Sequence, residues 1–165
     1  MRLLHVGCGG NPLPDWLGNY EEVRLDIDQS CNPDIVGDIL ELGEIGEFEA
    51  VFSSHNLEHV HQHEVSKALS EFYRVLSKDG ALIVFVPDCE GVSPTEDILF
   101  ESSAGGISGL DLLYGFRKVL KDKPYMAHKH AFTSSSLEKA LVDAGFRKVI
   151  VKRLFPFNMF GVGIK

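Results

Sequence analysis

Short apolar runs, each followed by a polar or glycine-rich break, recur along the chain and predict buried strands. We expect strands at residues 2–6, 23–25, 34–37, 49–53, 81–86, 149–154 and 159–164. The run at 81–86 is almost wholly apolar, which is typical of a central parallel strand covered on both faces.

Apolar positions at helical spacing predict the helices between these strands. Residues 65–76 carry an apolar residue every three to four positions, and Asp79-Gly80 predicts the end of that helix. Ser135-Ser136-Leu137-Glu138 has the spacing of a capping box, so a second helix should begin there and end at Gly145. Prolines after the first strand leave room only for a short helix at residues 14–17.

The alternation of strands and helices predicts an α/β fold with a parallel sheet and helices on both faces. Ligands of such sheets bind beyond the carboxyl ends of the strands. The residues that end the predicted strands should share that edge; they are Gly7, Asp26, Ser53 and Pro87. Residues 89–129 follow the strand that ends at this edge, and their hydrophobic pattern is irregular. They contain the pair Gly105-Gly106 and one predicted helix at 110–120. We expect a single domain at residues 1–165, in which residues 89–129 form a lid or substrate wall.

Composition narrows the function classes. The chain has 165 residues and a net charge of −8, and an acidic surface repels a phosphate backbone, so we expect no nucleic-acid partner. No apolar run approaches the roughly 18 residues that cross a membrane, and the N-terminus lacks the apolar core of a signal peptide. Three cysteines without C-x-x-C spacing indicate neither a disulfide framework nor a zinc site. We expect a cytoplasmic monomer or homodimer with no membrane partner.

The glycine loop Gly7-Cys8-Gly9-Gly10 and the acid that follows it predict a nucleoside ligand. Glycines let the backbone pass close to a ligand, and Asp26 lies 17 residues after Gly9, where a carboxylate can accept both hydrogen bonds of a ribose diol. Asp28 lies beyond the strand end and is the second candidate for the residue that binds the ribose. Pro12 replaces the third glycine of a dinucleotide fingerprint, so a nicotinamide oxidoreductase is the lesser alternative.

Eight short stretches of the sequence, taken in their order along the chain, carry a resemblance to a known family. They are residues 4–14, 25–28, 36–39, 54–59, 72–76, 86–88, 128–133 and 144–146. In this order they resemble the class I S-adenosylmethionine-dependent methyltransferases, in particular small bacterial-type members. The resemblance implies a Rossmann-like three-layer sandwich, with a mostly parallel seven-stranded sheet and an antiparallel C-terminal edge strand. It also implies S-adenosyl-L-methionine as the cofactor.

The resemblance implies a set of cofactor-binding residues. They are Gly7, Cys8, Gly9, Gly10, Asp26, Ile27, Asp38, Ile39, Ser53 and Ser54. Within this set the glycine loop would line the methionine part, residues 26–27 would hold the ribose and adenine, and residues 38–39 would meet the adenine. One departure is His5, because many family members have an acid there that contacts the cofactor amine.

Methyl transfer requires an acceptor held in line with the activated methyl carbon. A hydroxyl acceptor must also lose a proton, which a histidine can take. The catalytic candidates are His55, beside the expected methyl position, and then His128 and His130, which either face the mouth of the site or cap a turn. Analogy with relatives suggests a small-molecule acceptor, with O-methylation of a glycan or lipid-linked sugar as the first expectation. The alternative is a module that binds S-adenosylmethionine or S-adenosylhomocysteine without catalysis.

A cluster of histidines surrounds His55. His59 and His63 are four residues apart and could share a helical face with metal-ligand spacing. A polar helix start explains the same residues, and we expect no metal site.

Overall fold

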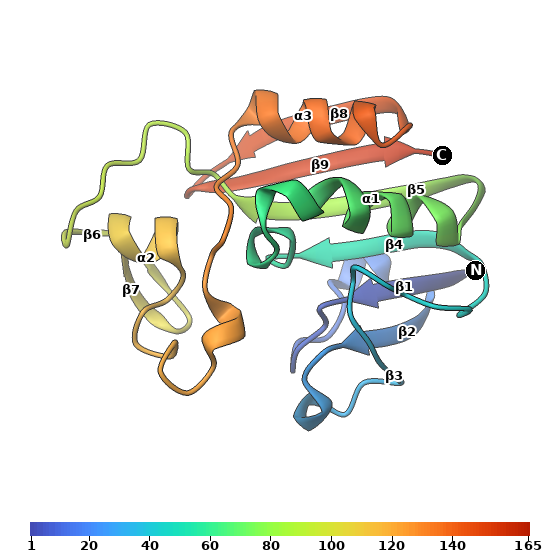
Figure 1. The fold of residues 1–165 in the computed structure, drawn as a ribbon, viewed down its shortest axis with the longest axis horizontal. Helices are drawn as coiled ribbons and strands as arrows, with labels where there is room; N and C mark the ends of the chain where they lie inside the picture. The colour runs from blue at the N-terminus through green and yellow to red at the C-terminus, as the bar shows by residue number, and fades with distance from the viewer.

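A seven-stranded sheet runs through the molecule, and two of the helices pack against it (Figure 1). The computed structural model describes all 165 residues. The strand order is β3-β2-β1-β4-β5-β9-β8. The strands are β1 (Arg2–Val6), β2 (Glu21–Asp26), β3 (Ile35–Val36), β4 (Phe48–Ser54), β5 (Leu76–Pro87), β8 (Arg147–Leu154) and β9 (Asn158–Ile164).

The strands from β3 to β5 are parallel to one another, and β9 is the one strand of the sheet that runs in the opposite direction to the others. The mostly parallel α/β sheet with a reversed C-terminal strand is therefore confirmed. The strand at the edge itself is β8, because β9 turns back after Pro156 and inserts between β5 and β8.

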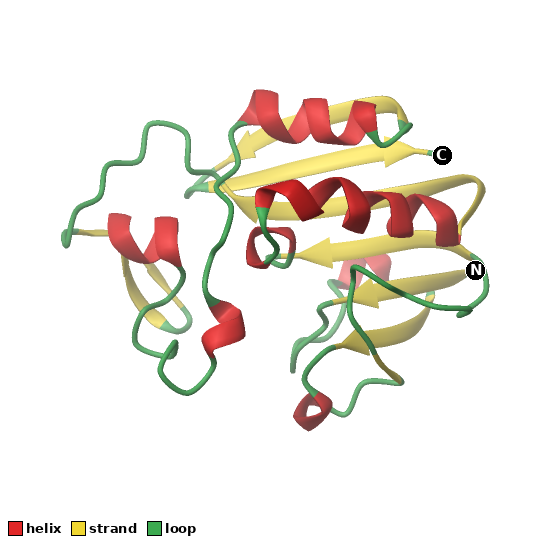
Figure 2. Cartoon of the chain, viewed as in Figure 1, coloured by secondary structure: helices red, strands yellow, loops and turns green.

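The two faces of the sheet are covered unequally. Helices α1 (Val65–Val75) and α3 (Ser134–Asp143) cover one face (Figure 2), over a core cluster of 23 buried residues. The other face has only the 3-10 turn η1 (Asp15–Leu17), over a cluster of five buried residues. The expected third layer is thus reduced to one turn, since prolines follow the glycine loop and exclude a longer helix.

Local sequence explains where the helices begin and end, with two corrections. The first helix ends at Val75, and the chain passes directly into β5, so that Asp79 adopts a positive φ of 63° within the turn at the start of that strand. Helix α3 begins one residue before the predicted box, because the side chain of Thr133 accepts a hydrogen bond from the N–H of Ser136. Gly145 ends α3 with a φ of 96°, as predicted.

The 89–129 segment lies beyond the carboxyl ends of the strands (Figure 1). It contains a hairpin of β6 (Ile98–Ser102) and β7 (Gly105–Ser108), helix α2 (Gly109–Tyr114) and the 3-10 turn η5 (Pro124–Met126). The predicted helix at 110–120 is wrong in length, because Gly115 has a φ of 92° and turns the chain away. None of the helices reaches the length and apolarity that a membrane crossing takes.

Candidate active site

Side chains of β2 hold the glycine loop in place. The Asp26 carboxylate accepts hydrogen bonds from the N–H of Gly9 at 2.7 Å and from the N–H of Asp28 at 2.8 Å. The Arg24 guanidinium donates to the carbonyl of Gly9 at 2.7 Å and to that of Asn11 at 3.0 Å. Because a carboxylate has about four acceptor positions, Asp26 can brace the loop and still accept from a ribose.

Sequence reasoning missed the role of Arg24, although a signal for it was present. Glu22, Arg24 and Asp26 alternate with apolar residues along β2, so one face of this strand is polar in a sheet that was expected to be buried on both faces. That polar face meets the glycine loop instead of a helix.

A cavity of about 210 Å³ opens beside the glycine loop. Its lining residues are His5, Gly7, Cys8, Asn11, Pro12, Pro14, Phe52, Ser54 and His55. At Gly7, φ is 63° and an added Cβ would lie 2.5 Å from the Asn56 side chain, so only glycine fits. His5 is buried below the loop and bonds the Glu22 carboxylate at 2.7 Å, and burial lowers the pKa of His5.

The other residues expected to bind the cofactor lie at or after the ends of strands and differ in how far they are buried. Ile27 and Asp38 are exposed, and so is Gly10, whereas Ile39 is buried in the main core. Ser53 is fully buried, and its hydroxyl has no hydrogen-bond partner. Ser54, next along β4, lines the cavity.

A second cavity of about 500 Å³ lies between the sheet edge and the 89–129 segment. Its lining residues are His55, Pro87, Phe100, Glu101, Ser102, Ser103, Ile107, Asp111, Leu112, Phe116, His128, Pro156, Phe157 and Asn158. Two of the three catalytic candidates, His55 and His128, therefore face one cavity. His130 is not among the lining residues; its ring packs edge-on against Phe132 at 4.3 Å between centroids.

His55 lines both cavities. Its backbone has a positive φ of 50°, a strained conformation for a residue with a Cβ. Its Nδ1 lies 3.5 Å from Oε1 of Glu58, whose side chain is 1% exposed. Desolvation opposes protonation of His55, but this carboxylate outweighs it and raises the pKa of His55.

The remaining acids near the strand ends have structural partners. Asp88 is buried and forms an ion pair with Arg153. Asp28 accepts a hydrogen bond from the N–H of Ser30 at 2.9 Å and one from the Tyr125 hydroxyl at 2.7 Å. These bonds lower the pKa of Asp28 to about 2, and the carboxylate raises the pKa of Tyr125 to about 12. Tyr125 thereby ties the 89–129 segment to the loop that follows β2.

Comparison with known proteins finds one matching family model and solved structures with the same fold. The model of a methyltransferase domain matches residues 4–84, which run from β1 to β5. An S-adenosylmethionine-dependent methyltransferase from Mesorhizobium loti superposes with a TM-score of 0.70 at 17% identity, over 99% of this chain and 90% of that one.

Two further solved structures share the fold. An S-adenosylmethionine-dependent methyltransferase from Archaeoglobus fulgidus gives a TM-score of 0.68 at 15% identity, over 99% of this chain and 86% of that one. A putative O-methyltransferase from Nostoc punctiforme gives 0.61 at 15% identity, over 99% of this chain and 51% of that one. No curated protein sequence matches the chain.

Proposed function

We propose that the chain is a class I S-adenosylmethionine-dependent methyltransferase and that it methylates a hydroxyl oxygen of a small polar acceptor. The acceptor class that we propose is a sugar, free or as part of a glycan or a lipid-linked sugar. The cofactor is S-adenosylmethionine.

The observation that carries this proposal is that His55 lines both cavities. The smaller cavity adjoins the glycine loop and suits the methionine part of the cofactor. The larger one takes the acceptor. Transfer by in-line displacement needs the acceptor atom within about 3 to 3.5 Å of the methyl carbon. Because His55 is part of the wall of both cavities, we propose that the cofactor and the acceptor approach each other beside it.

The lining of the larger cavity favours a sugar. Apolar rings such as Phe100 and Phe157, whose centroids are 5.8 Å apart, can cover the C–H face of a pyranose. Ser102, Ser103 and Asn158 can bond its hydroxyls. Transfer to oxygen agrees with the Nostoc punctiforme protein, which is described as a putative O-methyltransferase.

His55 is the residue that we propose to contact the reacting hydroxyl. One ring nitrogen faces Glu58, which orients the ring, and the other would accept a hydrogen bond from the acceptor hydroxyl. The 89–129 segment would act as the lid of this site, excluding water from the sulfonium during transfer.

The proposal is tested with trideuteromethyl S-adenosylmethionine and a panel of methyl glycosides, nucleotide sugars and lipid-linked sugars. Mass spectrometry should find the label on a hydroxyl oxygen of one sugar class. His55→Asn should lower turnover by about 100- to 10,000-fold, as expected for loss of a group that assists proton removal. It should still bind S-adenosylhomocysteine.

His61→Asn is the matched control, because His61 is exposed and stacks on His63 outside both cavities. Its turnover should equal that of the wild type. Label on nitrogen or carbon, or full activity of His55→Asn, would refute the proposed chemistry. S-adenosylhomocysteine binding without turnover of any acceptor in the panel would favour the non-catalytic module.

A further inference from the structure

Glu58 is a buried carboxylate without a sufficient partner. It lies in the 3-10 turn η3 (Leu57–His59), is 1% exposed, and neither of its oxygens has a hydrogen-bond partner. His55 approaches one oxygen only, at 3.5 Å, which is longer than a normal hydrogen bond. Because an unpaired buried charge is costly, the second oxygen should have a positive partner.

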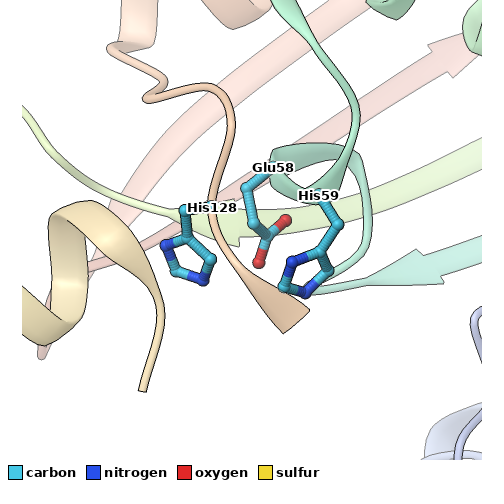
Figure 3. A group of neighbouring side chains, drawn as sticks. All are labelled: Glu58, His59 and His128. Atoms are coloured by element: carbon cyan, nitrogen blue, oxygen red, sulfur yellow. The ribbon is translucent and has the colours of Figure 1, made fainter. Parts of the chain in front are cut away.

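Two imidazole rings flank this carboxylate, one on each side (Figure 3). His59 follows Glu58 directly, whereas His128 comes from the far end of the 89–129 segment. The two ring centroids are 5.2 Å apart. Backbone bonds tie the two segments together, since the carbonyl of Glu58 accepts from the N–H of Lys129 at 2.8 Å and of His130 at 3.2 Å.

Each imidazole is held by one of its nitrogens. Nδ1 of His59 lies 3.2 Å from the carbonyl of Ala127, and Nδ1 of His128 lies 2.9 Å from that of Leu112. A carbonyl only accepts, so each Nδ1 carries the proton and each Nε2 keeps a free lone pair. An imidazole anchored to a backbone carbonyl in this way is the common arrangement of a metal-ligating histidine.

We propose that Glu58, His59 and His128 bind a divalent transition-metal ion. Each side chain offers a ligand atom, and the three atoms lie within 4.8 Å of one another. Bonds of about 2.0 to 2.2 Å to one ion would draw these atoms to roughly 3 to 3.5 Å apart. This site replaces the expectation of no metal, and it excludes His63, which lies in the separate turn η4 (Gln62–Glu64).

The ligand set indicates which ion. Two nitrogens and one carboxylate oxygen suit Zn²⁺, Fe²⁺, Co²⁺ or Ni²⁺, whereas Mg²⁺ and Ca²⁺ prefer oxygen ligands. Three protein ligands also leave at least one position open, as in catalytic rather than structural zinc sites.

The open position would face the acceptor, because His128 lines the larger cavity. An acceptor hydroxyl bound there would be polarised by the cation beside His55. This role rests on the proposed function, whereas binding of the ion does not.

Calorimetric titration with ZnCl2 tests the site on full-length protein stripped with a chelator, without cofactor or acceptor. We expect one ion per chain with micromolar affinity or better, and no comparable binding of Mg²⁺. Glu58→Gln and His128→Gln should each weaken binding at least about tenfold. The double variant His61→Ala/His63→Ala removes two exposed histidines nearby and should bind Zn²⁺ like the wild type.

A rise in melting temperature with S-adenosylhomocysteine shows whether each variant is folded. If Glu58→Gln does not fold, His128→Gln decides. Absence of Zn²⁺ binding in the wild type, equal binding in the ligand variants, or loss of binding in the control would overturn the site. Zn²⁺ binding together with acceptor turnover that is unaffected by chelation would retain the site and refute only its role toward the acceptor.

Discussion

The proposed cofactor side of the site, at the glycine loop, and the proposed acceptor side, at the larger cavity, are built in different ways. On the cofactor side, each functional loop directly follows a strand, and β2 side chains one strand away hold the glycine loop. On the acceptor side, much of the cavity wall comes from β6, β7 and α2, and His128 comes from beyond them. The first region is formed by loops that continue the strands, whereas the second is formed largely by a separate segment beyond the strand ends (Figure 1).

The difference predicts where stability resides. The sheet is stabilised by a core of 23 buried apolar residues. The 89–129 segment has a helix of six residues, and polar contacts replace much of the missing core. Asp111 bonds the Ser108 hydroxyl at 2.6 Å and the Arg117 Nε at 3.0 Å, and Arg117 in turn bonds Glu96. The acceptor side should therefore open without unfolding the cofactor side.

The largest expected effect compares one leucine from each region. Leu82 on β5 is fully buried, so Leu82→Ala should lower the free energy of global unfolding by about 2 to 5 kcal/mol. Leu112→Ala on α2 removes the same atoms but should lower it by less than about 1 kcal/mol, since the segment opens separately. Urea unfolding measures both. Equal losses would show that the two regions unfold as one unit.

Cofactor affinity should depend on the cofactor side alone. Asp26→Ala removes the brace of the glycine loop and the proposed ribose contact, and should weaken S-adenosylhomocysteine binding by about 1.5 to 3 kcal/mol. Asp28→Ala is the matched control and should change it little. Calorimetric titration of the folded variants checks this. A larger loss in Asp28→Ala would move the ribose contact to that residue.

Acid should weaken the acceptor side first. Burial would raise the pKa of Asp111, but hydrogen bonds from Ser108 and Arg117 outweigh it and hold the pKa at about 2. Because this value lies below that of the unfolded chain, the stabilisation is present above about pH 4 and is lost as the pH falls toward 2. Asp28, also with a pKa of about 2, loses its bond to Tyr125 over the same range.

Methyl NMR of leucines follows this transition. Signals of Leu112 and its helix neighbours should change between pH 4 and pH 2 before those of Leu82. Asp111→Asn should remove much of this pH dependence and destabilise the segment by about 1 to 3 kcal/mol at neutral pH. Simultaneous changes in both regions would contradict separate opening.

The same contrast explains what could be predicted from the sequence. The glycine loop and Asp26 are within 20 residues of each other and follow strands, so hydrophobic pattern and spacing were sufficient to place them. Glu58 gave no such signal, because only His59 of the two histidines that flank it is close to it in the sequence. His128 is 70 residues away, and its approach depends on the path of the 89–129 segment, which Gly115 redirects.

The smallest expected effect concerns the link between the two sides. Tyr125→Phe removes the hydrogen bond to Asp28 and should cost about 0.5 to 1.5 kcal/mol of segment docking. Amide hydrogen exchange across residues 102–115 should quicken accordingly, while residues 81–86 stay protected. In the wild type the same amides should exchange faster without ligand than with cofactor and acceptor. Protection equal to that of 81–86 in the ligand-free protein would refute the lid.

The position of the transferred methyl group tests the account most directly. With S-adenosylmethionine labelled with carbon-13 at the methyl group, nuclear Overhauser spectra of the binary complex report which side chains lie against that carbon. We expect contacts from the methyl protons to the His55 ring, which lines both cavities. Methyl contacts confined to the exposed residues Ile27 and Asp38, with none to His55, would contradict the assignment of the two cavities.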